Sequence, residues 1–123
     1  MLPDEGVVAS ALELIEIEEV ARLLASGGEG LFTEAERAYA GSKPDPERRL
    51  AARLAAKRAA ARLLGGPVRE VEVLRDPGFP PRLRFSARAQ QRLREVGAVR
   101  ALVSLTHERR HAAAAVLLLG EGG

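Results

Sequence analysis

Cysteine is missing from this 123-residue chain, and aromatic side chains are scarce, with three phenylalanines, one tyrosine and no tryptophan. The absence of cysteine excludes disulfide bonds, thiolate metal ligands and a thiol nucleophile, and it is compatible with a reducing compartment. Proteins that bind single-stranded nucleic acids usually stack the bases on aromatic rings. So few aromatic residues therefore argue against a nucleic-acid partner.

Long apolar runs are also absent. The amino-terminal run, residues 1–14, begins with Asp4 and Glu5 in place of basic residues and is too short to span a bilayer. We therefore expect neither a signal peptide nor a membrane partner, and we expect a cytoplasmic protein. The length suits a single domain over residues 1–123, near the lower limit for a chain that folds without a partner subunit.

Arginine is the prevalent charged residue. The net charge is only +2, but all except two of the 19 basic residues are arginine. The guanidinium group suits phosphate because its donors form a fixed fork, so the composition hints at an anionic ligand. Genomic base composition or heat adaptation explains the same richness in arginine equally well.

The hydrophobic pattern predicts an α+β domain with a mostly antiparallel sheet packed against one long helix. Residues 7–17 predict a buried strand that runs into a helix through about residue 25, and a capping box of Thr33 and Glu36 predicts a short helix over 34–40. The remaining predicted elements are a long helix over 46–64, strands around 71–73 and 83–85, a helix over 87–96, and strands over 99–105 and 112–119, the last buried on both faces.

The long helix has clear boundary signals and two rows of basic residues. Asp45 is expected to cap it, and Pro46 suits its first position. At helical spacing the first row consists of Arg49, Arg53 and Lys57, and the second of Arg58 and Arg62. The rows form either a platform for the phosphates of a nucleotide-like ligand or a solvated helix face.

Two histidines, His107 and His111, fall in the predicted final hairpin loop. No second set of ligands accompanies them, so a zinc site is not expected. Taken alone they are interpreted as exposed loop residues, but the residues that flank them form part of a recognisable motif.

Five segments in the right order resemble the holo-acyl-carrier-protein synthases, which are 4'-phosphopantetheinyl transferases. Residues 103–108 (Val-Ser-Leu-Thr-His-Glu) are similar to the closing motif of that family, and residues 31–36 (Leu-Phe-Thr-Glu-Ala-Glu) to its Phe-Thr-x-x-Glu segment. Residues 50–57 resemble its long-helix signature, residues 76–80 its turn with Gly-Lys-Pro, and residues 12–17 its opening strand. Each segment is weak alone, whereas the ordered set indicates the family.

The resemblance implies a phosphopantetheinyl transferase fold and a transferase that moves the 4'-phosphopantetheine arm of coenzyme A onto a serine of an apo acyl carrier protein. The carrier would serve fatty acid biosynthesis or another acyl-chain synthesis. The family uses magnesium to hold the pyrophosphate. The resemblance also implies a homotrimer with coenzyme A bound between neighbouring subunits.

The resemblance also assigns residues to the site. Its implied catalytic residues are Glu13, Lys57 and Arg58, with Glu13 as the metal ligand. Its implied coenzyme A contacts are Arg53, Lys57, Arg62, Gly78, Pro80, Ser104, Thr106 and His107.

Several positions depart from the family pattern. Arg58 occupies the position of the family's second metal-binding glutamate. Glu19 occupies a position where the family often has an arginine facing the carrier protein, and Phe79 replaces the family's turn lysine. Arg22 remains as a possible contact with the carrier. A guanidinium cannot ligate a cation. We therefore hypothesise that Arg58 occupies the magnesium position, pairs with Glu13 and donates hydrogen bonds to the pyrophosphate. The alternatives are a structural ion pair in a site that binds no ligand, and a relative that binds coenzyme A or a carrier protein without transfer.

Overall fold

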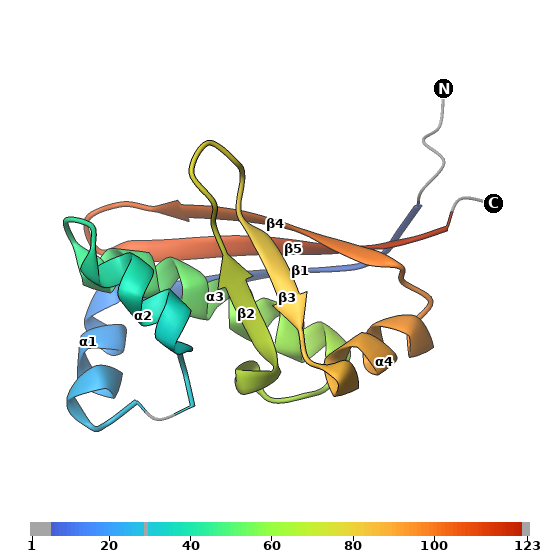
Figure 1. Cartoon of the computed structure of the whole chain (residues 1–123), viewed down its shortest axis with the longest axis horizontal. Coiled ribbons are helices and arrows are strands. Elements are labelled where there is room, and N and C mark those ends of the chain that lie inside the picture. The colour runs from blue at the N-terminus through green and yellow to red at the C-terminus, as the bar shows by residue number, and fades with distance from the viewer. Residues whose placement is uncertain (1–5, 29, 122–123) are drawn as a thin grey trace.

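A long central helix lies along one face of a three-stranded sheet. In the computed structural model, which describes residues 6–28 and 30–121, helix α3 (Pro46–Leu64) contacts all three strands of this sheet (Figure 1). The strand order is β1 (Gly6–Glu16), β5 (His111–Gly120) and β4 (Arg100–His107), and both pairs are antiparallel. The prediction that the long helix covers an antiparallel sheet is confirmed.

A separate hairpin packs on the other side of α3. The strands β2 (Val71–Leu74) and β3 (Arg82–Phe85) pair antiparallel, and the short 3-10 helix η1 (Val68–Glu70) precedes them. The predicted strand, turn and strand unit is confirmed, but it forms its own two-stranded sheet rather than extending the larger one.

Three shorter helices complete the fold. Helices α1 (Ile17–Ala25) and α2 (Glu34–Gly41) lie at one end of α3, and α4 (Ala87–Glu95) lies near the other (Figure 1). The predicted capping box at the start of α2 is present, because the Thr33 hydroxyl accepts from Glu36 N while the Glu36 carboxylate accepts from Thr33 N.

Alanine lets α3 approach its neighbours closely. Twelve of its residues are buried, among them a run of small side chains that contacts the sheet on one side and α2 and β2 on others. The predicted cap of α3 is wrong in one respect. Asp45 precedes the helix with a left-handed φ of 57°, and its side chain makes no capping bond but pairs with Arg48 at 3.4 Å.

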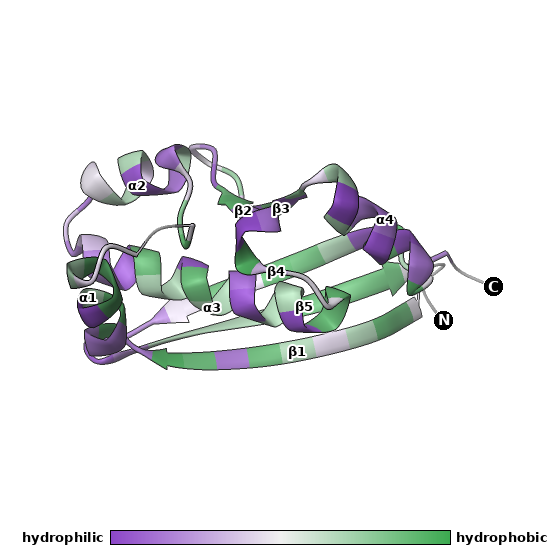
Figure 2. Cartoon of the chain, turned by 90° about the horizontal axis from the view of Figure 1, so that it is seen from below, coloured by the Kyte–Doolittle hydropathy of each residue, from purple (hydrophilic) through white to green (hydrophobic). Residues whose placement is uncertain are grey.

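Within the described residues, the outer face of the three-stranded sheet is left exposed. Leu12 and Leu14 of β1 are each 69% exposed, although their neighbours Glu13 and Ile15 turn toward α3. The predictions that β1 is a buried strand and that β5 is buried on both faces are therefore wrong for the chain alone. The reason is that the described helices cover only one face of this sheet, so the other face of β1 and β5, which are largely apolar (Figure 2), stays exposed.

Two of the earlier expectations reach beyond the described residues. Asp4 and Glu5 lie outside them, and so do both ends of the single domain expected over residues 1–123. The other predicted helices and strands agree with the structure to within one or two residues.

Candidate functional site

A basic cleft lies where the end of α2, the start of α3 and the β2–β3 turn meet. Its volume is about 510 Å³. The lining residues are Tyr39, Ser42, Lys43, Arg49, Arg75, Asp76, Pro77 and Gly78. Three of them are cationic and one is acidic, so the cleft favours an anionic ligand.

Arg53 of α3 lies buried beside this cleft with an incomplete set of partners. Only 3% of the residue is exposed, and its guanidinium stacks on the Tyr39 ring with Cζ 4.2 Å from the ring centroid. One Nη donates to the Arg49 carbonyl oxygen at 3.3 Å, but Nε has no partner among the described residues. Burial lowers the pKa of Arg53 below its ordinary value. A buried cation with an idle donor is costly, and an anion in the cleft would offset that cost.

The end of β4 adds a histidine to this positive environment. The pKa of His107 lies below its ordinary value of 6.5, first because of burial and then because of the charges of Arg49 and Arg48. The Nε of Arg49 is also buried without a partner in the described part of the chain. The structure thus brings His107, from a distant part of the sequence, close to Arg49 on α3, and Arg53 lies one helical turn further along that helix.

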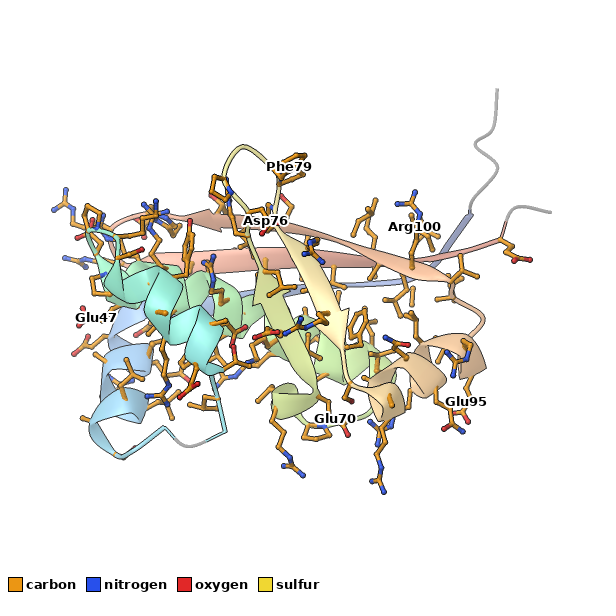
Figure 3. The ribbon with its side chains drawn as sticks, viewed as in Figure 1. Glu47, Glu70, Asp76, Phe79, Glu95 and Arg100 are labelled. Carbon is orange, nitrogen blue, oxygen red and sulfur yellow. The ribbon has the colours of Figure 1, made fainter. Side chains whose placement is uncertain are left out.

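The β2–β3 turn separates two of the predicted ligand contacts. Gly78 has φ of 81°, which glycine adopts without strain, and it lines the basic cleft. Pro80 lines a different cavity of about 460 Å³ together with Phe79, which is 66% exposed. Figure 3 shows Phe79 and Asp76 on the projecting turn. Gly78 therefore belongs to the cleft, whereas Pro80 does not.

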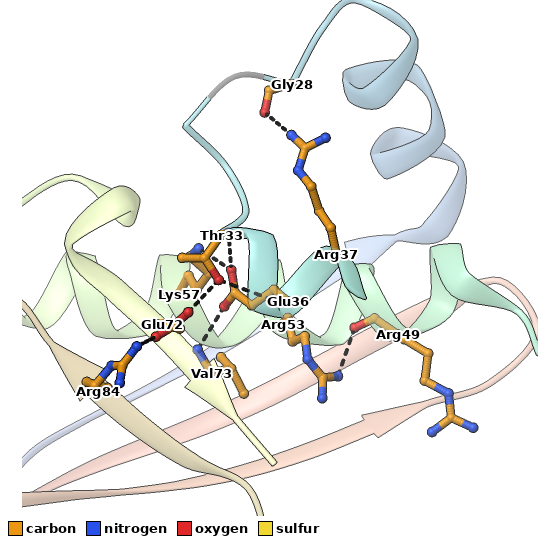
Figure 4. Close-up of polar contacts among 10 residues, drawn as sticks. All are labelled: Gly28, Thr33, Glu36, Arg37, Arg49, Arg53, Lys57, Glu72, Val73 and Arg84. Atoms are coloured by element: carbon orange, nitrogen blue, oxygen red, sulfur yellow. Dashed lines mark hydrogen bonds and ion pairs between the residues drawn. The ribbon is translucent and has the colours of Figure 1, made fainter. Parts of the chain in front are cut away.

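Lys57 is enclosed in a buried polar network (Figure 4). Its ammonium lies 2.7 Å from Glu36, and neither side chain has exposed surface. The other Glu36 oxygen accepts from Val73 N at 2.8 Å, and the Thr33 hydroxyl donates to Glu72 at 2.5 Å. The network joins α2, α3 and β2, so Lys57 stands as a structural residue. Its expected contact with ligand phosphates stays a prediction that this burial does not support.

The partner expected for Glu13 is wrong. Arg62 pairs with the Glu13 carboxylate at 2.6 Å and donates to the Leu12 carbonyl oxygen at 3.1 Å, whereas Arg58 pairs with Glu19 at 3.2 Å. Arg58 and Arg62 are one helical turn apart, so they meet different acids: Arg58 lies beside Glu19 of α1, and Arg62 lies beside Glu13 of β1. The neighbouring α1 thus supplies the acid for Arg58, a contact that the resemblance did not suggest.

The donors around Glu13 do not fit the expected magnesium. Mg²⁺ prefers oxygen ligands, and the Glu13 carboxylate is already bound to a guanidinium that cannot ligate a cation. In the described part of the chain, no three histidine, aspartate or glutamate side chains converge as metal ligands.

Two further predicted contacts, Ser104 and Thr106, lie on the other side of the sheet. Their neighbours Val103 and Leu105 pack into the core beneath α3, so the alternation of β4 turns Ser104 and Thr106 to the exposed outer face. A single chain therefore does not bring them to the basic cleft.

Another cavity is larger, at about 630 Å³, but suits an anion less well. Its lining residues are Glu16, Ile17, Glu18, Ala21, Glu47, Arg109, Arg110 and His111. The three glutamates offset the two arginines, and the described residues around it include no buried donor that lacks a partner. We therefore take the smaller basic cleft as the candidate site.

Comparison with known proteins decides the family. The holo-acyl-carrier-protein synthase of Thermus thermophilus is 43% identical over 117 residues, which cover 91% of this chain and 93% of the relative. The chain belongs to the holo-acyl-carrier-protein synthase family. No family profile matches it.

Solved holo-acyl-carrier-protein synthases share the fold. The Mycobacterium tuberculosis acyl carrier protein synthase is 33% identical with a TM-score of 0.72, and the match covers 94% of this chain and 99% of that one. The Chronobacterium ammoniagenes synthase in complex with coenzyme A is 26% identical with a TM-score of 0.76, covering 93% and 97%. The expected phosphopantetheinyl transferase fold is thereby confirmed.

The sequence missed part of the basic cleft of this synthase family member. Lys43 and Arg75 lie in connections between elements, and no periodic pattern marks such positions. Tyr39, on whose ring Arg53 stacks, follows the Phe-Thr-x-x-Glu segment and was not predicted as a site residue. Among the described residues, no helix is both long and apolar enough to cross a membrane.

Proposed function

We propose that this protein transfers the 4'-phosphopantetheine group from coenzyme A to a serine of an apo acyl carrier protein. Membership of the synthase family supports the reaction, and the structural observation that carries the proposal is the buried, incompletely bonded Arg53 beside a basic cleft. Coenzyme A bears a pyrophosphate and a further phosphate, which suit such a site.

Each cleft residue has a proposed role in holding coenzyme A. Arg49 and Arg53 would donate their unpaired Nε–H groups to phosphate oxygens. The pKa of His107 would rise as the anion binds near it. Gly78 would let the turn backbone come close to the ligand. Lys57 would hold α2 and β2 in place behind these groups.

We also propose that the protein is a homotrimer whose site is completed by a neighbouring subunit. The outer face of the sheet supports this because apolar and small side chains form rows across it. In register these rows are Ser10, Leu117 and Leu102; Leu12, Ala115 and Ser104; and Leu14, Ala113 and Thr106. Packing this face against another copy would bury the exposed leucines and carry Ser104 and Thr106 to a neighbour's cleft. A cytoplasmic location stays a prediction from the sequence.

A transfer assay tests the reaction. The protein is incubated with coenzyme A and apo acyl carrier protein from Thermus thermophilus, and the mass of the intact carrier is measured. Transfer should occur with the parent protein and fall at least tenfold in Arg53→Met, while Arg88→Met, an exposed arginine of the distant α4, should behave as the parent. Coenzyme A should also raise the pKa of His107 in NMR titrations.

One observation favours a second candidate, a relative that binds coenzyme A without transfer. Glu13, the carboxylate that matches the family motif, is occupied by Arg62 and so is poorly placed to act as a general base. A rise in the His107 pKa on adding coenzyme A, together with no carrier modification, would favour this candidate. Transfer to the carrier would exclude it.

Light scattering tests the assembly. The parent should have the mass of three chains, and Leu12→Glu, which places a charge on the exposed apolar face, should shift it toward the monomer. A monomeric parent at micromolar concentration contradicts the trimer but leaves the proposed reaction open.

A further inference from the structure

Outside the basic cleft, two neighbouring ion pairs join α3 to β1 and α1. Arg62 binds Glu13 at 2.6 Å, and one turn earlier Arg58 binds Glu19 at 3.2 Å. The Arg62 guanidinium is also fixed by its bond to the Leu12 carbonyl oxygen at 3.1 Å. Two acids and two guanidinium groups therefore balance one another where the family is expected to hold a divalent cation.

The charges and ligands of these four side chains disfavour a bound cation. A divalent ion would have to displace Arg62 from Glu13 and then stay close to two fixed positive charges. Glu19 cannot become a free second ligand unless Arg58 also leaves it. Both steps remove charge-assisted hydrogen bonds, and neither supplies the several oxygen ligands that Mg²⁺ requires.

The same arrangement can accept an anion. A guanidinium has five N–H donors, and among the described residues Arg58 uses one and Arg62 uses two. The side chains of Arg58 and Arg62 are 35% and 58% exposed, so their remaining donors are open to solvent. A phosphate group that reaches this part of α3 would meet donors already oriented by Glu19 and Glu13.

We infer that this protein binds the phosphates of coenzyme A without a divalent metal, with the guanidinium groups of Arg58 and Arg62 supplying the positive charge. The inference rests on the proposed function, because coenzyme A is the ligand that the function supplies. It revises the earlier hypothesis in one respect. Arg62, rather than Arg58, holds Glu13, and Arg58 is held by Glu19.

Two binding measurements test this inference. Isothermal titration of the full chain with coenzyme A is carried out in EDTA and again in Mg²⁺, and we expect dissociation constants within twofold of each other. Mn²⁺ alone, titrated into the protein and followed by its electron paramagnetic resonance signal, should remain free. Affinity that falls tenfold or more in EDTA, or tight binding of Mn²⁺ alone, overturns the inference while leaving the proposed function intact.

A charge reversal sharpens the test. Arg58→Glu replaces a guanidinium by a carboxylate next to Glu19, so it should weaken coenzyme A binding in EDTA at least tenfold, and added Mg²⁺ should restore part of the loss. Arg88→Glu makes the same change of charge on α4 and should bind as the parent. An Arg58→Glu protein that keeps its circular dichroism spectrum and its affinity in EDTA would overturn the role of Arg58. If the parent binds no coenzyme A in either buffer, both the inference and the proposed function fail.

Discussion

Removing the positive charge of Lys57 should destabilise this protein far more than removing an exposed arginine. The Lys57 ammonium lies 2.7 Å from Glu36 and both side chains are fully buried, so Lys57→Met leaves a carboxylate buried without its cation. Removing one partner of a buried pair costs about 3–5 kcal/mol. We expect the lower end, about 3 kcal/mol, because Glu36 still accepts from Thr33 N and Val73 N.

Urea unfolding followed by circular dichroism at one fixed protein concentration measures this effect. The double variant Lys57→Met with Glu36→Gln should recover at least half of the lost free energy of unfolding, because a neutral amide is cheaper to bury and its oxygen can still accept one backbone N–H. The control Arg88→Met should stay within about 0.5 kcal/mol of the parent. A loss below about 1 kcal/mol in Lys57→Met would refute the reasoning from burial and pairing.

Three further outcomes are expected. In Arg49→Met, NMR titration should show the His107 pKa rising toward 6.5, because one of the charges that lower it is gone, and an unchanged pKa would contradict that cause. Hydrogen bonds from a histidine ring and from a backbone N–H lower the pKa of Glu108 from 4.5 to about 2, so its stabilising contribution is present above pH 4.5 and is lost as the pH falls toward 2. Thermal unfolding of Glu108→Gln should accordingly depend less on pH in this window than that of the parent, and identical curves would count against the bond. Gly120→Ala should lower the free energy of unfolding by about 1–3 kcal/mol, because the added Cβ would lie 2.8 Å from a backbone carbonyl oxygen, whereas Gly41→Ala meets nothing within 4 Å and should be neutral or slightly stabilising; equal effects in urea unfolding would contradict this.

Local signals in the sequence predicted the helices and strands well. Thr33 with Glu36 marked the start of α2, Pro46 marked the start of α3, and the predicted range 46–64 matches α3 to the residue. Such signals work because a cap or a helix stop depends on atoms only a few positions apart. The failure at Asp45 is also local, since its left-handed backbone turns the carboxylate toward Arg48 instead of the helix N–H groups.

Side-chain partners were predicted less well. Arg49, Arg53 and Lys57 share one helical row, yet Lys57 is buried against Glu36 while Arg53 lies on Tyr39 beside the cleft. Helical spacing places residues on one face but does not say what covers each position along it.

The sequence by itself determined the family, the order of the elements and the arginine-rich character of α3, because these depend on residue identity and on short-range periodicity. Only the tertiary structure decided which acid each guanidinium meets and which side of the sheet carries Ser104 and Thr106. The pairing follows from how α3 packs against β1 and α1, where Arg58 reaches Glu19 and Arg62, one helical turn later, reaches Glu13. The outward position of Ser104 and Thr106 follows from which face of the sheet α3 covers. Such packing depends on several segments at once, so it cannot be predicted from any one of them.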